Sequence, residues 1–142
     1  LLGLLSSSTN PFLVHVGSIV YTIGLLVETL ADFQKWWFKQ ANPGRFCNVG
    51  LWALSQHPNF FGNLVLWFGI LLINLPAFLH PSTGYRRLAL ALISPLFMWS
   101  LLYGEAVGVV TNAKQLALDK YGHDMEYQKY IQEVPVMIPK LW

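Results

Sequence analysis

The chain has 142 residues, of which 54% are hydrophobic and only 11% are charged. Soluble domains carry about a quarter charged residues, so this composition excludes an ordinary water-facing globular protein. A formal net charge of +2 without a long Lys/Arg run predicts no nucleic-acid partner. The single cysteine, Cys47, excludes an internal disulfide.

Three apolar segments are each long enough to cross a bilayer, which takes about 20 mostly apolar residues. The first covers residues 11–31. Asn10 is its expected N-cap, and Pro11 takes the first helical position, where a missing N–H costs nothing. The second segment covers residues 58–79 and the third covers residues 88–110. These segments predict three transmembrane helices.

The last segment, residues 111–142, is too polar to cross a membrane. It predicts an amphipathic helix, a turn at residues 122–124 and a second short helix, all lying at the inner face. The fold class is therefore an all-α membrane protein in which residues 1–142 form one membrane domain. The chain begins at Leu1 without a signal-peptide pattern, so we expect it to be the C-terminal part of a longer protein.

Basic residues in the loops predict the orientation. Two arginines, Arg86 and Arg87, fall on one side of the membrane. Seven basic residues fall on the other side: Lys35, Lys39, Arg45, Lys114, Lys120, Lys129 and Lys140. By the positive-inside rule, residues 32–57 and 111–142 face the cytosol, stroma or matrix, in an organellar or endoplasmic reticulum membrane.

Polar residues within the predicted spans gather at one depth. Glu28 and Asp32 lie one helical turn apart, and so do Asn59 and Asn63. Glu105 lies in the last third of the third span, which ends on the same side. Ionisable groups in a membrane usually face a bundle interior, so we expect Glu28, Asp32, Asn59 and Glu105 to line one cavity. An interfacial pair with a nearby lysine is the alternative for Asp32.

The stretch "SQHPNFFGN", residues 55–63, opens the second span. Pro58 disfavours the helical conformation at His57, which makes His57 the expected helix boundary. The free N–H groups and the dipole of the first turn favour an anion such as phosphate. Gly62 lets a ligand or another helix approach closely. A plain helix start, in which His57 caps and Gly62 packs, is the alternative.

Four stretches together resemble the steroid 5-alpha-reductase-like membrane family, in particular a branch known only as a domain of unknown function. They are, in chain order, "LVETLADFQK", "GLWALSQHPNFFGNLVLWFGILL", "SPLF" and "KYGHDMEYQKYIQEVPVMIP". The resemblance covers nearly the whole chain from the first span onward. More distantly, the sequence is similar to isoprenylcysteine carboxyl methyltransferases and sterol reductases.

This resemblance implies NADPH as cofactor and a lipophilic, steroid- or isoprenoid-like substrate. The implied cofactor-binding residues are Glu28, Asp32, His57, Asn59, Gly62 and Lys114. Tyr127 and Tyr130 match aromatic positions of the family's tail, where packing is the expected role. No metal is predicted, because the histidines have no partners at metal-ligand spacing. Gly104 and Gly108 have the small-xxx-small spacing of a helix-packing motif.

Three positions depart from the family element, which commonly reads Ser-Arg-His-Pro-Asn-Tyr-Phe-Gly-Glu. Gln56 stands for its arginine, Phe60 for its tyrosine and Asn63 for its glutamate. Glutamine cannot give a phosphate the charge of an arginine. The resemblance and these three departures from it lead to two alternative functions. One is an NADPH-dependent reduction of a double bond conjugated to a carbonyl. The other is a non-enzymatic accessory subunit of a respiratory or photosynthetic membrane complex, in contact with lipids and other subunits.

Overall fold

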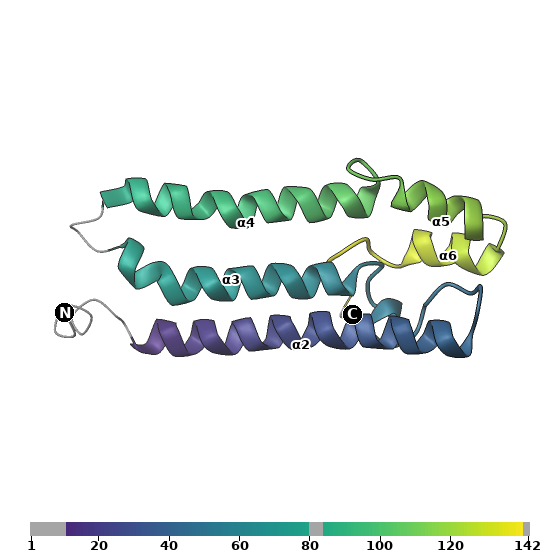
Figure 1. Ribbon diagram of the computed structural model, residues 1–142, viewed down its shortest axis with the longest axis horizontal. Helices are drawn as coiled ribbons and strands as arrows, with labels where there is room; N and C mark the ends of the chain where they lie inside the picture. Colours follow the sequence, from purple (N-terminus) through teal and green to yellow (C-terminus); the bar gives the residue numbers. More distant parts are fainter. Residues whose placement is uncertain (1–10, 80–83, 141–142) are drawn as a thin grey trace.

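The computed structural model describes residues 11–79 and 84–140. Their helices, in chain order, are α2 (Pro11–Ala41), the 3₁₀ turn η1 (Gly50–Ala53), α3 (Pro58–Phe78), α4 (Gly84–Val107), α5 (Ala113–Tyr121) and α6 (Met125–Glu133). Helices α2, α3 and α4 lie side by side in that order, each antiparallel to its neighbour (Figure 1). The short elements η1, α5 and α6 gather at one end, which we call the tail end (Figure 1).

The three long helices are each apolar and long enough to cross a membrane, as the sequence predicted. Their bounds differ from the predicted ones. Helix α2 continues past residue 31 to Ala41, because no helix breaker occurs before the Asn42-Pro43-Gly44 turn. Helix α4 begins at Gly84 and ends at Val107. The predicted cap Asn10 lies outside the described residues.

Helices α2 and α3 pack backbone against backbone along a glycine seam, formed by Gly17, Gly24, Gly62 and Gly69. A Cβ atom placed on Gly24 would lie 2.3 Å from the backbone nitrogen of Leu66. One placed on Gly62 would lie 2.5 Å from the backbone nitrogen of Glu28. Small residues allow such approach in lipid, where helices associate through close packing rather than through the hydrophobic effect. Gly62 therefore accommodates a neighbouring helix, one of the two roles that the sequence allowed for it.

Helix α4 ends at a glycine. Gly108 has φ +84°, a left-handed conformation that side chains disfavour. The N–H of Val109 then donates to the carbonyl of Gly104 at 2.7 Å, which closes the last turn. The Gly104–Gly108 pair thus terminates a helix, and its interpretation as a helix-packing motif is wrong. The helix-packing glycines are those of the glycine seam, seven residues apart on each helix.

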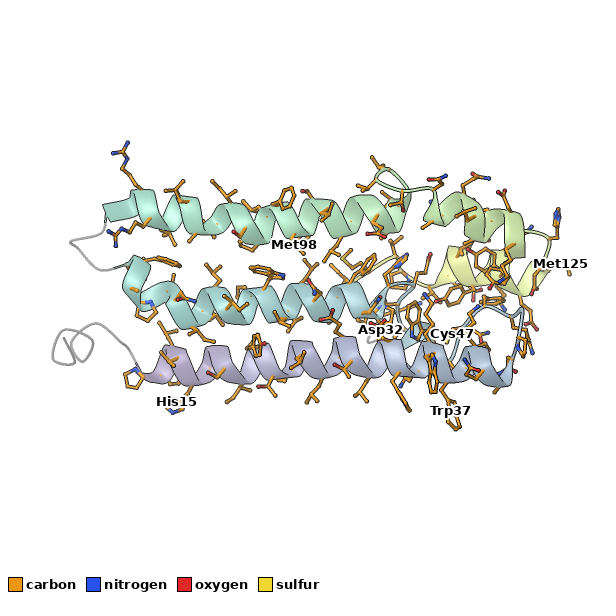
Figure 2. All side chains as sticks on the ribbon, viewed as in Figure 1. His15, Asp32, Trp37, Cys47, Met98 and Met125 are labelled. Atoms are coloured by element: carbon orange, nitrogen blue, oxygen red, sulfur yellow. The ribbon has the colours of Figure 1, made fainter. Side chains whose placement is uncertain are left out.

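Buried side chains concentrate at the tail end. Trp52 is buried against Ala31 and Cys47, and its indole N–H donates to the carbonyl of Ala31 at 2.8 Å. Phe46 packs against Tyr127 with ring centroids 5.1 Å apart. Along the long helices, many large apolar side chains are exposed, as expected for lipid-facing surfaces. Figure 2 shows all described side chains and labels Cys47 within the tail end.

Candidate functional site

A network of hydrogen bonds, which we call the tail clasp, ties residues 130–140 to the loop that precedes α3. Ser55 Oγ donates to the carbonyl of Met137 at 2.7 Å, and Gln56 N–H donates to that of Pro135 at 2.9 Å. Tyr130 Oη donates to the carbonyl of Trp52 at 2.7 Å. This clasp folds the tail back over the ends of the long helices.

Gln56 is the centre of the tail clasp. Its side-chain Nε2 donates to the carbonyls of Ile131 at 3.1 Å and Val134 at 2.6 Å. Both donor hydrogens of the amide are therefore used within the protein. The position that carries arginine in the resembling family thus binds the tail in this chain.

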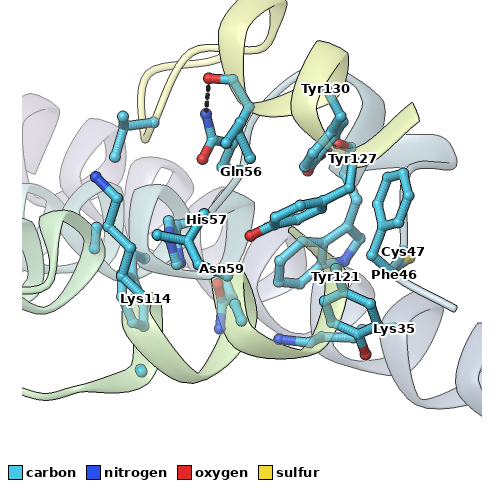
Figure 3. Close-up of a pocket in the computed structure, with 18 of the residues that line it drawn as sticks. Lys35, Phe46, Cys47, Gln56, His57, Asn59, Lys114, Tyr121, Tyr127 and Tyr130 are labelled. Carbon is cyan, nitrogen blue, oxygen red and sulfur yellow. Dashed lines mark hydrogen bonds between the residues drawn. The ribbon is translucent and has the colours of Figure 1, made fainter. Parts of the chain in front are cut away.

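Between the tail and the long helices lies a cavity of about 390 Å³. This volume falls within the roughly 300–1,000 Å³ of small-molecule sites. Its wall combines aromatic and polar side chains from α2, α3, α4, α5, α6 and the loop before α3 (Figure 3). The polar lining residues are Lys35, Lys39, Gln56, His57, Asn59, Glu105, Lys114, Tyr121, Tyr127 and Tyr130.

The structure brings part of the predicted site together. His57, Asn59 and Lys114 line the cavity, and so does Glu105. Figure 3 shows His57, Asn59 and Lys114 around the same space. Glu28, Asp32 and Gly62 do not line it. The expectation that Glu28, Asp32, Asn59 and Glu105 share one cavity is therefore wrong for Glu28 and Asp32.

The two acidic residues of α2 instead bind asparagines of α3. Asn59 Nδ2 donates to Asp32 Oδ1 at 3.0 Å, and Asn63 Nδ2 donates to Glu28 Oε1 at 3.1 Å. The remaining amide oxygens, Oδ1 of Asn59 and Oδ1 of Asn63, are buried without a partner. Asp32 thus takes an amide partner rather than the lysine of the interfacial-pair alternative. Asp32 does not line the cavity itself but holds Asn59, which does.

His57 is a neutral member of the wall. Burial, with the nearby charge of Lys35, lowers the pKa of His57 to about 4. Its ring stacks on Phe60 with centroids 4.9 Å apart and planes 12° from parallel. No side-chain capping hydrogen bond of His57 forms at the start of α3. The ring therefore offers the cavity a flat, uncharged surface.

Three lysines give the cavity a positive charge. Lys35, Lys39 and Lys114 line it, against Glu105 as the acidic lining residue. Lys39 Nζ donates to Tyr121 Oη at 2.7 Å and to the carbonyl of Arg45. Lys35 Nζ lies 4.5 Å from the ring centroid of Trp52. The excess of ammonium groups favours an anionic ligand.

Lys35, Lys39 and Tyr121 also line the cavity but were not predicted from the sequence as site residues. A signal for the lysines was present. Residues 28, 32, 35 and 39 repeat at helical spacing and so share one face of α2 once the helix is known to reach Ala41. No such signal pointed to Tyr121, because its approach to Lys39 depends on how the tail folds back. Tyr127 and Tyr130 both pack against Phe46, with ring centroids 5.1 Å and 5.3 Å apart, as expected.

In the part of the chain that the structure describes, no group of three or more His, Cys, Asp or Glu side chains is placed to hold a metal ion.

Comparison with known proteins gives a family but no function. A family model described as "Protein of unknown function (DUF1295)" matches residues 5–134. Comparison with curated proteins and comparison with solved structures give no match.

Proposed function

We propose that this chain, which belongs to the DUF1295 family, is a membrane-embedded NADPH-dependent reductase-like protein. Its substrate would be a lipophilic molecule, steroid- or isoprenoid-like, with a double bond conjugated to a carbonyl. The observation that carries the proposal is the cavity at the tail end, with three lysines and an aromatic wall beside apolar helices. The resemblance to steroid 5-alpha-reductase-like proteins supports it.

The types of side chain that line the cavity suit the phosphates and bases of a dinucleotide. Ammonium groups of Lys35, Lys39 and Lys114 suit its phosphates, and aromatic rings suit its bases. The stacked pair His57 and Phe60 provides a flat, uncharged surface. Gln56 does not favour nucleotide binding, because the hydrogen-bond donors of its side chain are already bound to tail carbonyls. Binding would therefore depend on the lysines rather than on this position.

NADPH, when bound, would supply the hydride. The chain's part would be to hold its phosphates through the lysines and to orient its reactive ring near the membrane. Asn59, fixed by Asp32, would keep its position at the wall. Helix α4 makes far fewer contacts with α3 than α2 does, so a lipophilic substrate could reach the cavity past α4.

A second function is an accessory subunit without catalysis, in a respiratory or photosynthetic membrane complex. The tail clasp favours it, because the family's most polar motif position is used here to hold the fold together. This alternative predicts that no nucleotide binds.

The test is a fluorescence titration of the detergent-purified protein with NADPH. We expect saturable binding that Lys35→Met weakens by roughly tenfold or more, because a charged hydrogen bond is lost. Lys129→Met is the matched control, since Lys129 pairs with Glu133 at 3.9 Å and does not line the cavity. Absence of binding at millimolar NADPH would refute the reductase proposal and leave the accessory subunit.

A further inference from the structure

Two ammonium groups converge on one tyrosine at the tail end of the cavity. Lys39 Nζ lies 4.8 Å from the ring centroid of Tyr121, and Lys120 Nζ lies 5.3 Å from the same centroid. Lys39 also donates a hydrogen bond to Tyr121 Oη at 2.7 Å. Because the lysine donates, the phenolic proton stays available for an acceptor. Lys39 and Tyr121 line the cavity.

The acidic residues of the surrounding segments have other partners. Glu126 pairs with Arg45 at 3.2 Å, and Asp119 accepts from Gln115 at 2.8 Å. Asp124 caps α6 by accepting from the N–H of Glu126 at 2.8 Å. Glu133 pairs with Lys129. Among the described residues, neither Lys39 nor Lys120 forms an ion pair. Their charges are therefore oriented but not neutralised.

The field of these lysines acts on the tyrosine itself. Burial alone would raise the pKa of Tyr121, but the hydrogen bonds and charges of Lys39 and Lys120 outweigh it and lower that pKa. Burial raises the pKa of the neighbouring Tyr127 and Tyr130 instead. Of these three tyrosines, Tyr121 is the one whose pKa is lowered, because the two nearby lysines favour negative charge at its position.

We infer that Lys39, Lys120 and the hydroxyl of Tyr121 form a binding site for a phosphate monoester. Two ammonium groups and one hydroxyl donor match the charge and the acceptor oxygens of such a group. The identity of this group rests on the proposed function, under which it would be the 2′-phosphate of NADPH, a group that NADH lacks. The same chemistry would also fit the headgroup of a phosphatidic-acid lipid or free phosphate.

The experiment compares probes that differ by this group. Purified protein is titrated with NADPH and with NADH, with inorganic phosphate as competitor, and with phosphatidylcholine vesicles containing or lacking phosphatidic acid. The variants are Lys39→Met and Lys120→Met, with Lys129→Met as the control. Lys120 is exposed, and the contact that the structure describes for it is with Tyr121 of the same helix. Its variant therefore tests binding even if Lys39→Met loosens the loop at Arg45.

We expect NADPH to bind roughly 10- to 100-fold more tightly than NADH. Lys120→Met should reduce this preference while leaving NADH affinity unchanged, because Lys120 does not line the cavity. Lys39→Met should also reduce it, by weakening NADPH binding more than NADH binding. The control Lys129→Met should change neither affinity. Binding of phosphatidic-acid vesicles or free phosphate that depends on these lysines, without nucleotide binding, would keep the phosphate site and refute the reductase proposal. Equal affinity for NADPH and NADH, with no lysine-dependent binding of phosphate or phosphatidic acid, would overturn the site and leave nucleotide binding standing.

Discussion

The two halves of the molecule are held together by different forces. In the apolar half, α2 and α3 meet along the glycine seam, where each backbone lies against the other. At the tail end, the contacts are directional hydrogen bonds of the tail clasp and edge-to-face aromatic rings. Helix α4 is held less closely, because its contact with α3 is smaller than the contact between α2 and α3.

The difference follows from the surroundings of each half. Lipid is as apolar as a leucine side chain, so helices within it gain little from burying apolar surface and must pack closely. Polar tail segments cannot pack that way, but their backbone groups can bond to side chains such as Gln56. The cavity lies between the closely packed helices of the apolar half and the hydrogen-bonded tail end. Its α2–α3 side should be rigid, and its α4 side should be more easily displaced.

The largest effect should come from breaking the glycine seam. Gly24→Ala places a Cβ atom 2.3 Å from the backbone of Leu66, which cannot move without shifting α3. We expect destabilisation at or above the upper end of the roughly 1–3 kcal/mol of overpacking substitutions. The thermal unfolding midpoint in detergent measures it. Ala89→Leu on the exposed face of α4 is the control, and equal losses from both would contradict the comparison.

The next effect concerns pH at the junction of the two halves. The pKa of His57 is lowered to about 4, so between that value and its ordinary pKa the unfolded chain binds more protons than the folded one. Stability should be fully present above about pH 6.5 and fall as the pH drops toward 4, by up to about 3 kcal/mol.

Unfolding of wild type and His57→Gln at several pH values measures this contribution. The variant should lose the corresponding part of the pH dependence, whereas His123→Gln, at an exposed position, should keep it. An identical pH profile for wild type and His57→Gln would show that His57 is not held in its neutral form.

The smallest effect is expected at the tail clasp. Gln56→Ala leaves the carbonyls of Ile131 and Val134 without their donors, at a cost of about 1–3 kcal/mol to tail docking. Amide hydrogen exchange should accelerate in residues 131–140 and stay unchanged in the glycine seam. Gln132→Ala, at an exposed position, is the control. Faster exchange throughout α2 and α3 would mean that the two halves are not separately stabilised.

The sequence by itself determined the apolar spans and the two tail helices. Length, hydropathy and the glycine and proline breakers act locally, so they can be followed along the chain. It also determined the depth at which the polar residues of the spans gather, because helical rise converts position into depth. The closing glycine of α4 and the length of α2 were misjudged, although both depend on local signals.

Only the tertiary structure decided which polar residues share the cavity. Helical spacing shows that Glu28 and Asp32 lie on one face with Lys35 and Lys39, but not which partner that face meets. The glycine seam brings α3 so close that Asn59 and Asn63 take the two carboxylates, while the lysines beyond them face the tail. Gln56 was expected to be a lost phosphate ligand and instead holds the tail. Its partners lie some 75 residues further along the chain, and only folding brings such distant groups into contact.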